Sequence, residues 1–139
     1  MNRLFSITIL FFTFCFSSEI AAQCGAGETE IIITITTDNY PAETSWQLID
    51  QNGIGWYISA GDLTLANTTY IYSYCVPDTN CYSFKIFDIY GDGICCSYGN
   101  GSYQLTYGGN VMVSGGAFTY SETTFNIGTC SGLSLVCPA

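Results

Sequence analysis

Apolar and polar residues alternate along most of this chain, in short runs separated by glycine-rich stretches. In the first run, residues 31–36, Ile31, Ile33 and Ile35 occupy every second position. A period of two is typical of β-strands, because successive strand residues point to opposite faces of a sheet. The same period predicts further strands over residues 46–49, 56–58, 70–74, 82–86, 103–107 and 123–127.

Turn signals between these runs complete an all-β pattern. Asn52-Gly53 favours a tight hairpin, and the glycines at 108–109 and 115–116 predict two further hairpins. About eight short strands at this spacing are typical of a β-sandwich. No long window beyond residue 22 shows helical periodicity. We therefore predict one small antiparallel β-sandwich, of the jelly-roll or CUB-like type, stapled by disulfides.

The first 22 residues differ from the rest. Arg3 precedes an apolar run from Leu4 to Phe16, and small residues end the segment at Ala22. This order is typical of a secretory signal peptide, and the run is shorter than the ~20 residues that span a membrane. We expect a signal peptide at 1–22 and a single domain at 23–139 with a short cysteine-containing tail. The domain should be secreted, extracellular or at the cell surface, without membrane insertion.

Composition excludes several kinds of activity and partner. The chain has no histidine, so serine triads, Cys–His pairs and histidine zinc sites are absent. Its formal net charge is -9, and Lys85 is the only basic residue after position 22. Such an acidic chain lacks the basic surface that nucleic acid requires. Cations or uncharged ligands such as glycans remain as partners, and we expect no enzymatic activity.

Cysteines indicate an oxidising compartment. The chain has eight, one of them (Cys15) in the expected leader, which leaves Cys24, Cys75, Cys81, Cys95, Cys96, Cys130 and Cys137. Seven cysteines in a small exported domain predict a disulfide framework. We expect the pair Cys75 and Cys81 to meet the pair Cys95 and Cys96, and Cys24 to reach the C-terminal pair. Six paired cysteines allow fifteen connectivities. The odd cysteine could stay buried or bridge to another chain.

Residues 88–101 form the most unusual stretch, with glycines and aspartates between two predicted strands. Asp88 and Asp92 are spaced like the first ligands of an EF-hand, but Tyr90 stands at the third position and Gly99 where the glutamate would be. An EF-hand is therefore excluded. A different calcium site remains open, since Ca²⁺ accepts six to eight oxygens in loose geometry. We predict Asp88, Asp92 and Glu43 as its ligands, with Ca²⁺ as the expected cofactor. Alternatively, the aspartates only cap turns.

Aromatic residues offer a second candidate surface. The residues are Trp56, Tyr57, Tyr70, Tyr72 and Tyr74, and they could form a platform for a glycan or a protein partner. Alternatively, they cover the core of a thin sandwich. Asn67 and Asn100 begin Asn-X-Ser/Thr triplets and are candidate glycosylation sites.

A family resemblance follows from these motifs. It rests on Glu43-Thr44-Ser45-Trp46, Cys75…Cys81-Tyr82, Asp88…Tyr90-Gly91-Asp92-Gly93-Ile94-Cys95-Cys96 and Gly99…Gly101-Ser102-Tyr103. In this order the motifs resemble a module that recurs in secreted proteins of marine bacteria and microbial eukaryotes, over roughly residues 30–127. The resemblance implies an extracellular β-sandwich but no particular activity. Asn39-Tyr40-Pro41 is also similar to CUB domains, some of which hold calcium with acidic residues.

Two functions follow as hypotheses. The first is a non-enzymatic secreted structural protein that self-associates through strand edges into an extracellular fibre or matrix, with calcium as a stabilising ion. The alternative is a calcium-dependent carbohydrate-binding or adhesion module.

Overall fold

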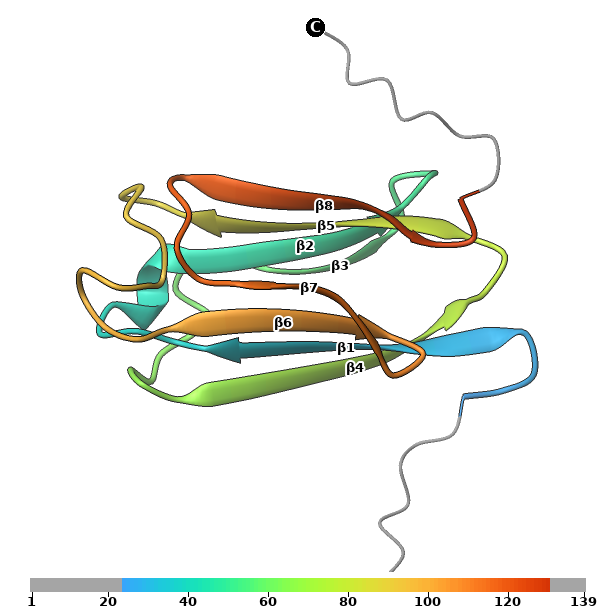
Figure 1. The fold of residues 1–139 in the computed structure, drawn as a ribbon, viewed down its shortest axis with the longest axis horizontal. Helices are drawn as coiled ribbons and strands as arrows, with labels where there is room; N and C mark the ends of the chain where they lie inside the picture. The colour runs from blue at the N-terminus through green and yellow to red at the C-terminus, as the bar shows by residue number, and fades with distance from the viewer. Residues whose placement is uncertain (1–23, 131–139) are drawn as a thin grey trace, which may run out of the picture.

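Two four-stranded antiparallel sheets pack face to face in the computed structural model, which describes residues 24–130 (Figure 1). The expected leader at 1–22 and Cys137 lie outside the described residues. The strands are β1 (Glu28–Thr36), β2 (Thr44–Asp50), β3 (Gly55–Ile58), β4 (Thr69–Pro77), β5 (Cys81–Asp88), β6 (Ser102–Tyr107), β7 (Asn110–Gly115) and β8 (Ser121–Gly128). The predicted small, disulfide-stapled all-β sandwich is confirmed.

The chain passes back and forth between the two sheets. One sheet has the order β4-β1-β6-β7 and the other β3-β2-β5-β8. Asn52-Gly53 and Gly108-Gly109 join neighbouring strands, β2–β3 and β6–β7, as predicted, and both Gly53 and Gly109 have the positive φ that favours glycine there. The prediction of a hairpin at Gly115-Gly116 is wrong. Because β7 and β8 belong to different sheets, this turn carries the chain across the sandwich.

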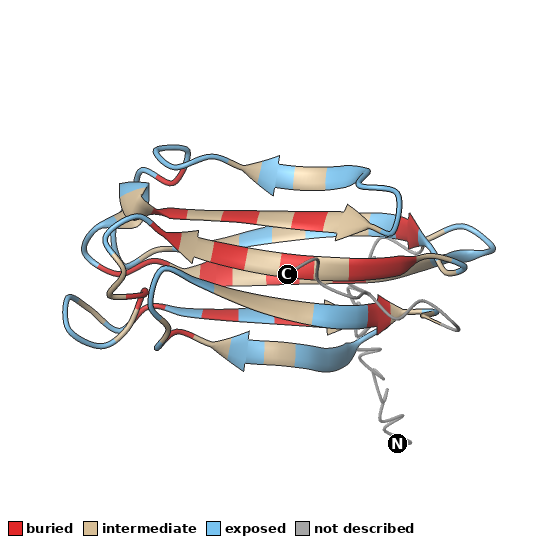
Figure 2. Cartoon of the chain, turned by 90° about the horizontal axis from the view of Figure 1, so that it is seen from above, coloured by how far each residue is buried: buried red, intermediate tan, exposed pale blue. Residues whose placement is uncertain are grey.

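The core lies between the sheets and explains the alternation in the sequence. Figure 2 shows buried residues alternating with less buried ones along the strands. The inward-facing side chains include Ile33 and Leu105 from one sheet and Trp46 and Phe84 from the other, all at most 1% exposed. Each such large side chain stabilises the fold by about 1.5–3 kcal/mol through burial. No helix within residues 24–130 is long and apolar enough to span a membrane.

The aromatic residues of β3 and β4 border this core. Tyr70, Tyr72 and Tyr74 point inward along β4 and are partly buried against the core cluster. Trp56 stacks on Tyr74 with 4.8 Å between ring centroids. Only Tyr57, which is 75% exposed, turns its ring to solvent. Four of the five candidate platform residues therefore pack at the edge of the core.

The disulfides differ from the pairing expected from sequence. The structure joins Cys24 to Cys75, Cys81 to Cys130, and Cys95 to its neighbour Cys96. Strand pairing explains the difference. β1 pairs with β4, which brings the segment before β1 to the end of β4, and β5 pairs with β8, which brings Cys81 to the end of β8. Cys95 and Cys96 follow the far end of β5, and are therefore at the opposite end of the sandwich from Cys75 and Cys81.

Candidate metal centre

Three carboxylates converge at the end of the sandwich where β5 ends. Glu43 closes a short 3₁₀ helix (Pro41–Glu43), Asp88 is the last residue of β5, and Asp92 lies in the loop that follows. One carboxylate oxygen from each lies within 4.8 Å of the others. The β2–β5 ladder causes this, because it places Thr44 opposite Asp88, and the Ile89 N–H donates to the Glu43 carbonyl at 3.2 Å. The structure thus brings together all three residues predicted as metal ligands.

A fourth carboxylate, Asp38, lies near this cluster, since the charges of Asp88 and Asp92 act on it. It follows β1, is only 4% exposed, and its Oδ1 accepts a hydrogen bond from the Tyr40 N–H at 2.8 Å. Sequence analysis missed Asp38, because it stands 50 positions before Asp88 and outside the glycine-rich loop. Its position just after a predicted strand is the only local signal, and that signal does not show which loop Asp38 faces.

The loop after β5 has the geometry of an aspartate-capped turn. Asp88 Oδ1 accepts hydrogen bonds from the N–H groups of Gly91 and Asp92. Gly91 and Gly93 both have positive φ, and a Cβ on Gly93 would lie 2.5 Å from the Phe118 carbonyl oxygen. Turn capping therefore does occur, but it uses Oδ1. Among residues 24–130 no hydrogen bond reaches Asp88 Oδ2, which leaves that oxygen for a ligand.

The negative charges of the cluster are uncompensated within the described chain. Burial, followed by the charges of Asp88, Asp92 and Asp38, raises the pKa of Glu43. Burial is also the largest cause that raises the pKa of Asp38, ahead of the charges of Asp88 and Asp92, while its bond from the Tyr40 N–H opposes the rise. Lys85, the only basic residue in 24–130, instead lies over the Phe87 ring at 4.7 Å. A divalent cation would relieve this repulsion.

Thr44 gives a second, independent sign of a missing partner. Its side chain is fully buried, and within residues 24–130 its Oγ1 has no hydrogen-bond partner. Thr44 lies directly opposite Asp88 in the ladder, and both are buried on the inner face of the sheet. Leaving a buried hydroxyl unsatisfied costs roughly 1–3 kcal/mol. An ion or its bound water beside Asp88 would satisfy it.

The ligand chemistry favours calcium. Every candidate donor in the cluster is an oxygen, which suits hard cations rather than zinc or copper. Several carboxylates on separate loops match the loose, high-coordination geometry of Ca²⁺ better than the strict octahedron of Mg²⁺. Glu43, Asp88 and Asp92 would supply the carboxylate ligands, with the Asp38 charge nearby.

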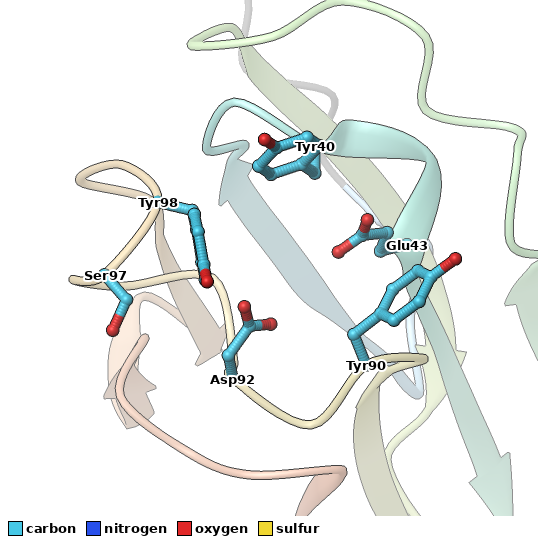
Figure 3. A pocket seen from close by; sticks show the side chains of 6 residues that line it. All are labelled: Tyr40, Glu43, Tyr90, Asp92, Ser97 and Tyr98. Atoms are coloured by element: carbon cyan, nitrogen blue, oxygen red, sulfur yellow. The ribbon is translucent and has the colours of Figure 1, made fainter.

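A pocket opens beside the cluster. It has a volume of about 580 Å³ and is lined by Tyr40, Glu43, Tyr90, Asp92, Ser97 and Tyr98. In Figure 3 the carboxylates of Glu43 and Asp92 point into a space bordered by Tyr40 and Tyr98, and Tyr90 lies beside Glu43. Tyr40, Tyr90 and Tyr98 are 49%, 69% and 51% exposed. These tyrosines are a different aromatic set from the one singled out in the sequence.

The candidate glycosylation sites lie at the same end. Asn67 and Asn100 are both exposed, and the Asn67 Nδ2 donates to Asn39 Oδ1 at 3.0 Å. Asn39 in turn donates its backbone N–H to the carbonyl of Tyr98, which lines the pocket. The predicted platform residues Trp56, Tyr70, Tyr72 and Tyr74 do not line this pocket and border the core instead.

No protein-family model, curated protein or solved structure matches the chain. The resemblance to a recurrent secreted module therefore stays an expectation, and function must be argued from the residues.

Proposed function

We propose that this chain is a secreted, non-enzymatic adhesion module that requires calcium. The observation that carries the proposal is the convergence of the Glu43, Asp88 and Asp92 carboxylates within 4.8 Å, beside a tyrosine-lined pocket. The Asp38 charge lies near enough to interact with Asp88 and Asp92, and the buried Thr44 stands opposite Asp88 in the ladder. Bound Ca²⁺ would tie the segment before β2 to the loop after β5, and so fix the walls of the pocket.

The extracellular setting of this proposal rests on the disulfides. Three disulfides in a small domain fit an oxidising compartment. Outside the cell, Ca²⁺ sites of extracellular modules typically bind with dissociation constants of about 10⁻⁴–10⁻³ M. A site of only moderate affinity would therefore be filled there and not inside a cell.

Calorimetric titration of the folded, disulfide-intact protein with CaCl₂ tests the calcium centre. We expect one site for the unmodified chain and at least a tenfold loss of affinity for Asp88→Asn, because the neutral amide removes a ligand charge. Glu28→Gln is the matched control. It removes one negative charge at the exposed start of β1, the opposite end of the strand from Asp38. Absence of calcium binding, or an equal loss in both variants, would overturn the proposal.

Self-assembly is the second candidate function, and the β4 edge favours it. β4 pairs with β1 over all nine residues without a register shift and carries no charged side chain. The other sheet edges have features that discourage pairing: β7 and β8 contain register irregularities, and β3 has four residues. A second copy of the chain could add its own β4 to this uncharged edge, where pairing avoids the repulsion expected between two acidic domains.

Sedimentation velocity over a concentration series tests this second function. We expect the unmodified chain to form larger species as concentration rises, and Ile71→Lys to stay monomeric, since it places a charge on the exposed face of β4. Ile54→Lys is the control, because Ile54 is similarly exposed but lies in the β2–β3 turn. A monomer at every concentration would rule out assembly through β4.

A further inference from the structure

We infer that the tyrosine-lined pocket binds a neutral sugar, through a pair of adjacent hydroxyl groups that complete the calcium coordination. The inference rests on the calcium centre proposed above and names its ligand. It does not use the platform predicted from sequence, since most of those rings border the core. The pocket instead combines Tyr40, Tyr90 and Tyr98 with the carboxylates of Glu43 and Asp92.

The three tyrosines have the exposure that sugar stacking needs. Each ring is between 49% and 69% exposed, although burial would stabilise such a large aromatic side chain. Aromatic rings pack against the C–H faces of pyranoses, and their hydroxyl groups hydrogen-bond to the sugar rim. Tyr40 and Tyr98 meet edge to face, with 5.6 Å between their centroids. Figure 3 shows Tyr40 and Tyr98 bordering the space into which the Glu43 and Asp92 carboxylates point, while the Tyr90 ring lies beside Glu43 with its hydroxyl group directed outward.

Backbone contacts hold the pocket in place before a ligand arrives. The Asn39 N–H donates to the Tyr98 carbonyl at 3.2 Å, which joins the segment after β1 to the loop before β6. The Asp38 carboxylate accepts from the Tyr40 N–H, and Pro41 begins the 3₁₀ helix directly after Tyr40. Because these contacts fix the aromatic walls, binding would lose little conformational entropy.

Charge selects a neutral sugar over an acidic one. Four carboxylates and one Ca²⁺ leave a formal charge of about -2 at the site. Residues 24–130 contain a single basic side chain, Lys85. Its ammonium group lies over the Phe87 ring, and it does not line the pocket. Uronic acids, sialic acids and sulfated sugars would therefore meet uncompensated repulsion. Two neutral hydroxyl oxygens can instead fill open positions on Ca²⁺, which accepts six to eight oxygen ligands.

Glycan-array binding with and without calcium tests the inference, using the disulfide-intact chain and neutral, amino and acidic sugars as probes. We expect calcium-dependent retention of neutral glycans and no retention of acidic ones. Tyr98→Ala should weaken that binding roughly three- to tenfold, as expected for one aromatic contact, while Tyr98→Phe keeps most of it. Tyr57→Ala is the matched control, because Tyr57 is the most exposed tyrosine outside the pocket.

Calorimetry on the same samples separates the two proposals. Calcium binding without retention of any neutral glycan overturns the sugar site but leaves the calcium centre intact. Absence of both calcium binding and glycan retention overturns both proposals. Retention of acidic or amino sugars alone, binding that ignores calcium, or an equal effect of Tyr57→Ala and Tyr98→Ala would each overturn the sugar site as drawn here.

Discussion

The two ends of the sandwich hold their loops in different ways. At one end, two disulfides join elements that are far apart in sequence: Cys24 to Cys75 and Cys81 to Cys130. At the other end, the one disulfide found there among residues 24–130 links the neighbours Cys95 and Cys96. It therefore ties no two elements together. That second end, on the left in Figure 1, carries the carboxylate cluster. Covalent links thus fix one end, whereas the other depends on hydrogen bonds and, in our proposal, on an ion.

This contrast has an electrostatic meaning. At the carboxylate end, burial and like charges together raise the pKa values of Asp38 and Glu43, and the cation of our proposal would neutralise that charge. At the disulfide end the two covalent links do not depend on a bound ion. A domain built in this way can stay folded in the absence of calcium and still change the order of one end when calcium binds.

The largest expected effect comes from removing a long-range disulfide. Cys81 and Cys130 are 49 residues apart, and closing a loop of that size stabilises a protein by about 4 kcal/mol in the chain-entropy estimate. Replacing both with serine should therefore lower the free energy of unfolding by up to this amount in urea titrations. The double replacement of Cys95 and Cys96 is the comparison, because it opens no long loop. Equal losses for the two double variants would contradict the contrast between the ends.

Calcium should act on the opposite end. A free Ca²⁺ concentration of 100 times the dissociation constant would stabilise the native state by about 2.7 kcal/mol. In hydrogen–deuterium exchange, we expect the added protection to concentrate in residues 38–44 and 88–98. The β4–β5 connection and the end of β8 should change little. Protection spread evenly over both ends, or confined to the disulfide end, would show that the ion binds elsewhere.

The carboxylate end also shows how much of the candidate site can be predicted from the sequence. Asp88, Asp92 and Glu43 could be selected because oxygen ligands on a glycine-rich loop suggest calcium, and the period of two placed the strands that position them. Asp38 could not be selected, since only the packing of the end of β1 against the loop after β5 brings it near. The same limit applies to Tyr40 and Tyr98, whose exposure depends on tertiary contacts.

The disulfides illustrate a related limit. Their number indicated an oxidised framework, but their pairing depends on which strands are neighbours. Alternation shows which face of a strand is buried and not which strand lies beside it, so β1 beside β4 and β5 beside β8 could not be predicted.

Acidity should distinguish the ends in the calcium-free protein. A carboxyl group whose pKa is raised on folding binds its proton more tightly in the native state, so it stabilises that state as the pH falls. For Glu43 the gain begins near its raised pKa and is complete below the usual value of 4.5. Glu43→Gln should therefore be more stable than the unmodified chain at neutral pH. This difference in unfolding free energy should shrink towards pH 4. With calcium the sign reverses at neutral pH, because the ion needs the ionised carboxylate.

Urea titrations at several pH values, with and without calcium, measure that difference. Asp50 is the internal contrast at the other end of β2, since hydrogen bonds from Ile54 and Asn52 lower its pKa despite an opposing effect of burial. Its contribution is present at neutral pH and is lost as the pH falls through its lowered pKa. A Glu43→Gln difference that does not depend on pH would contradict repulsion within the cluster.

Thr44 offers the smallest and most specific test, because one substitution should have opposite effects in the two states of the carboxylate end. Thr44→Val keeps the shape of the side chain and removes a buried hydroxyl that has no partner among the described residues. Without calcium the variant should be more stable by about 1 kcal/mol, since an unsatisfied polar group is lost. With calcium the hydroxyl gains a partner beside Asp88, so the same change should weaken calcium binding several-fold. Thr34→Val, on the outward-facing side of β1, should show neither effect. If Thr44→Val stabilised the two states equally, the hydroxyl would have no part in the site, and the cluster would have to hold its ion with carboxylates and carbonyl groups alone.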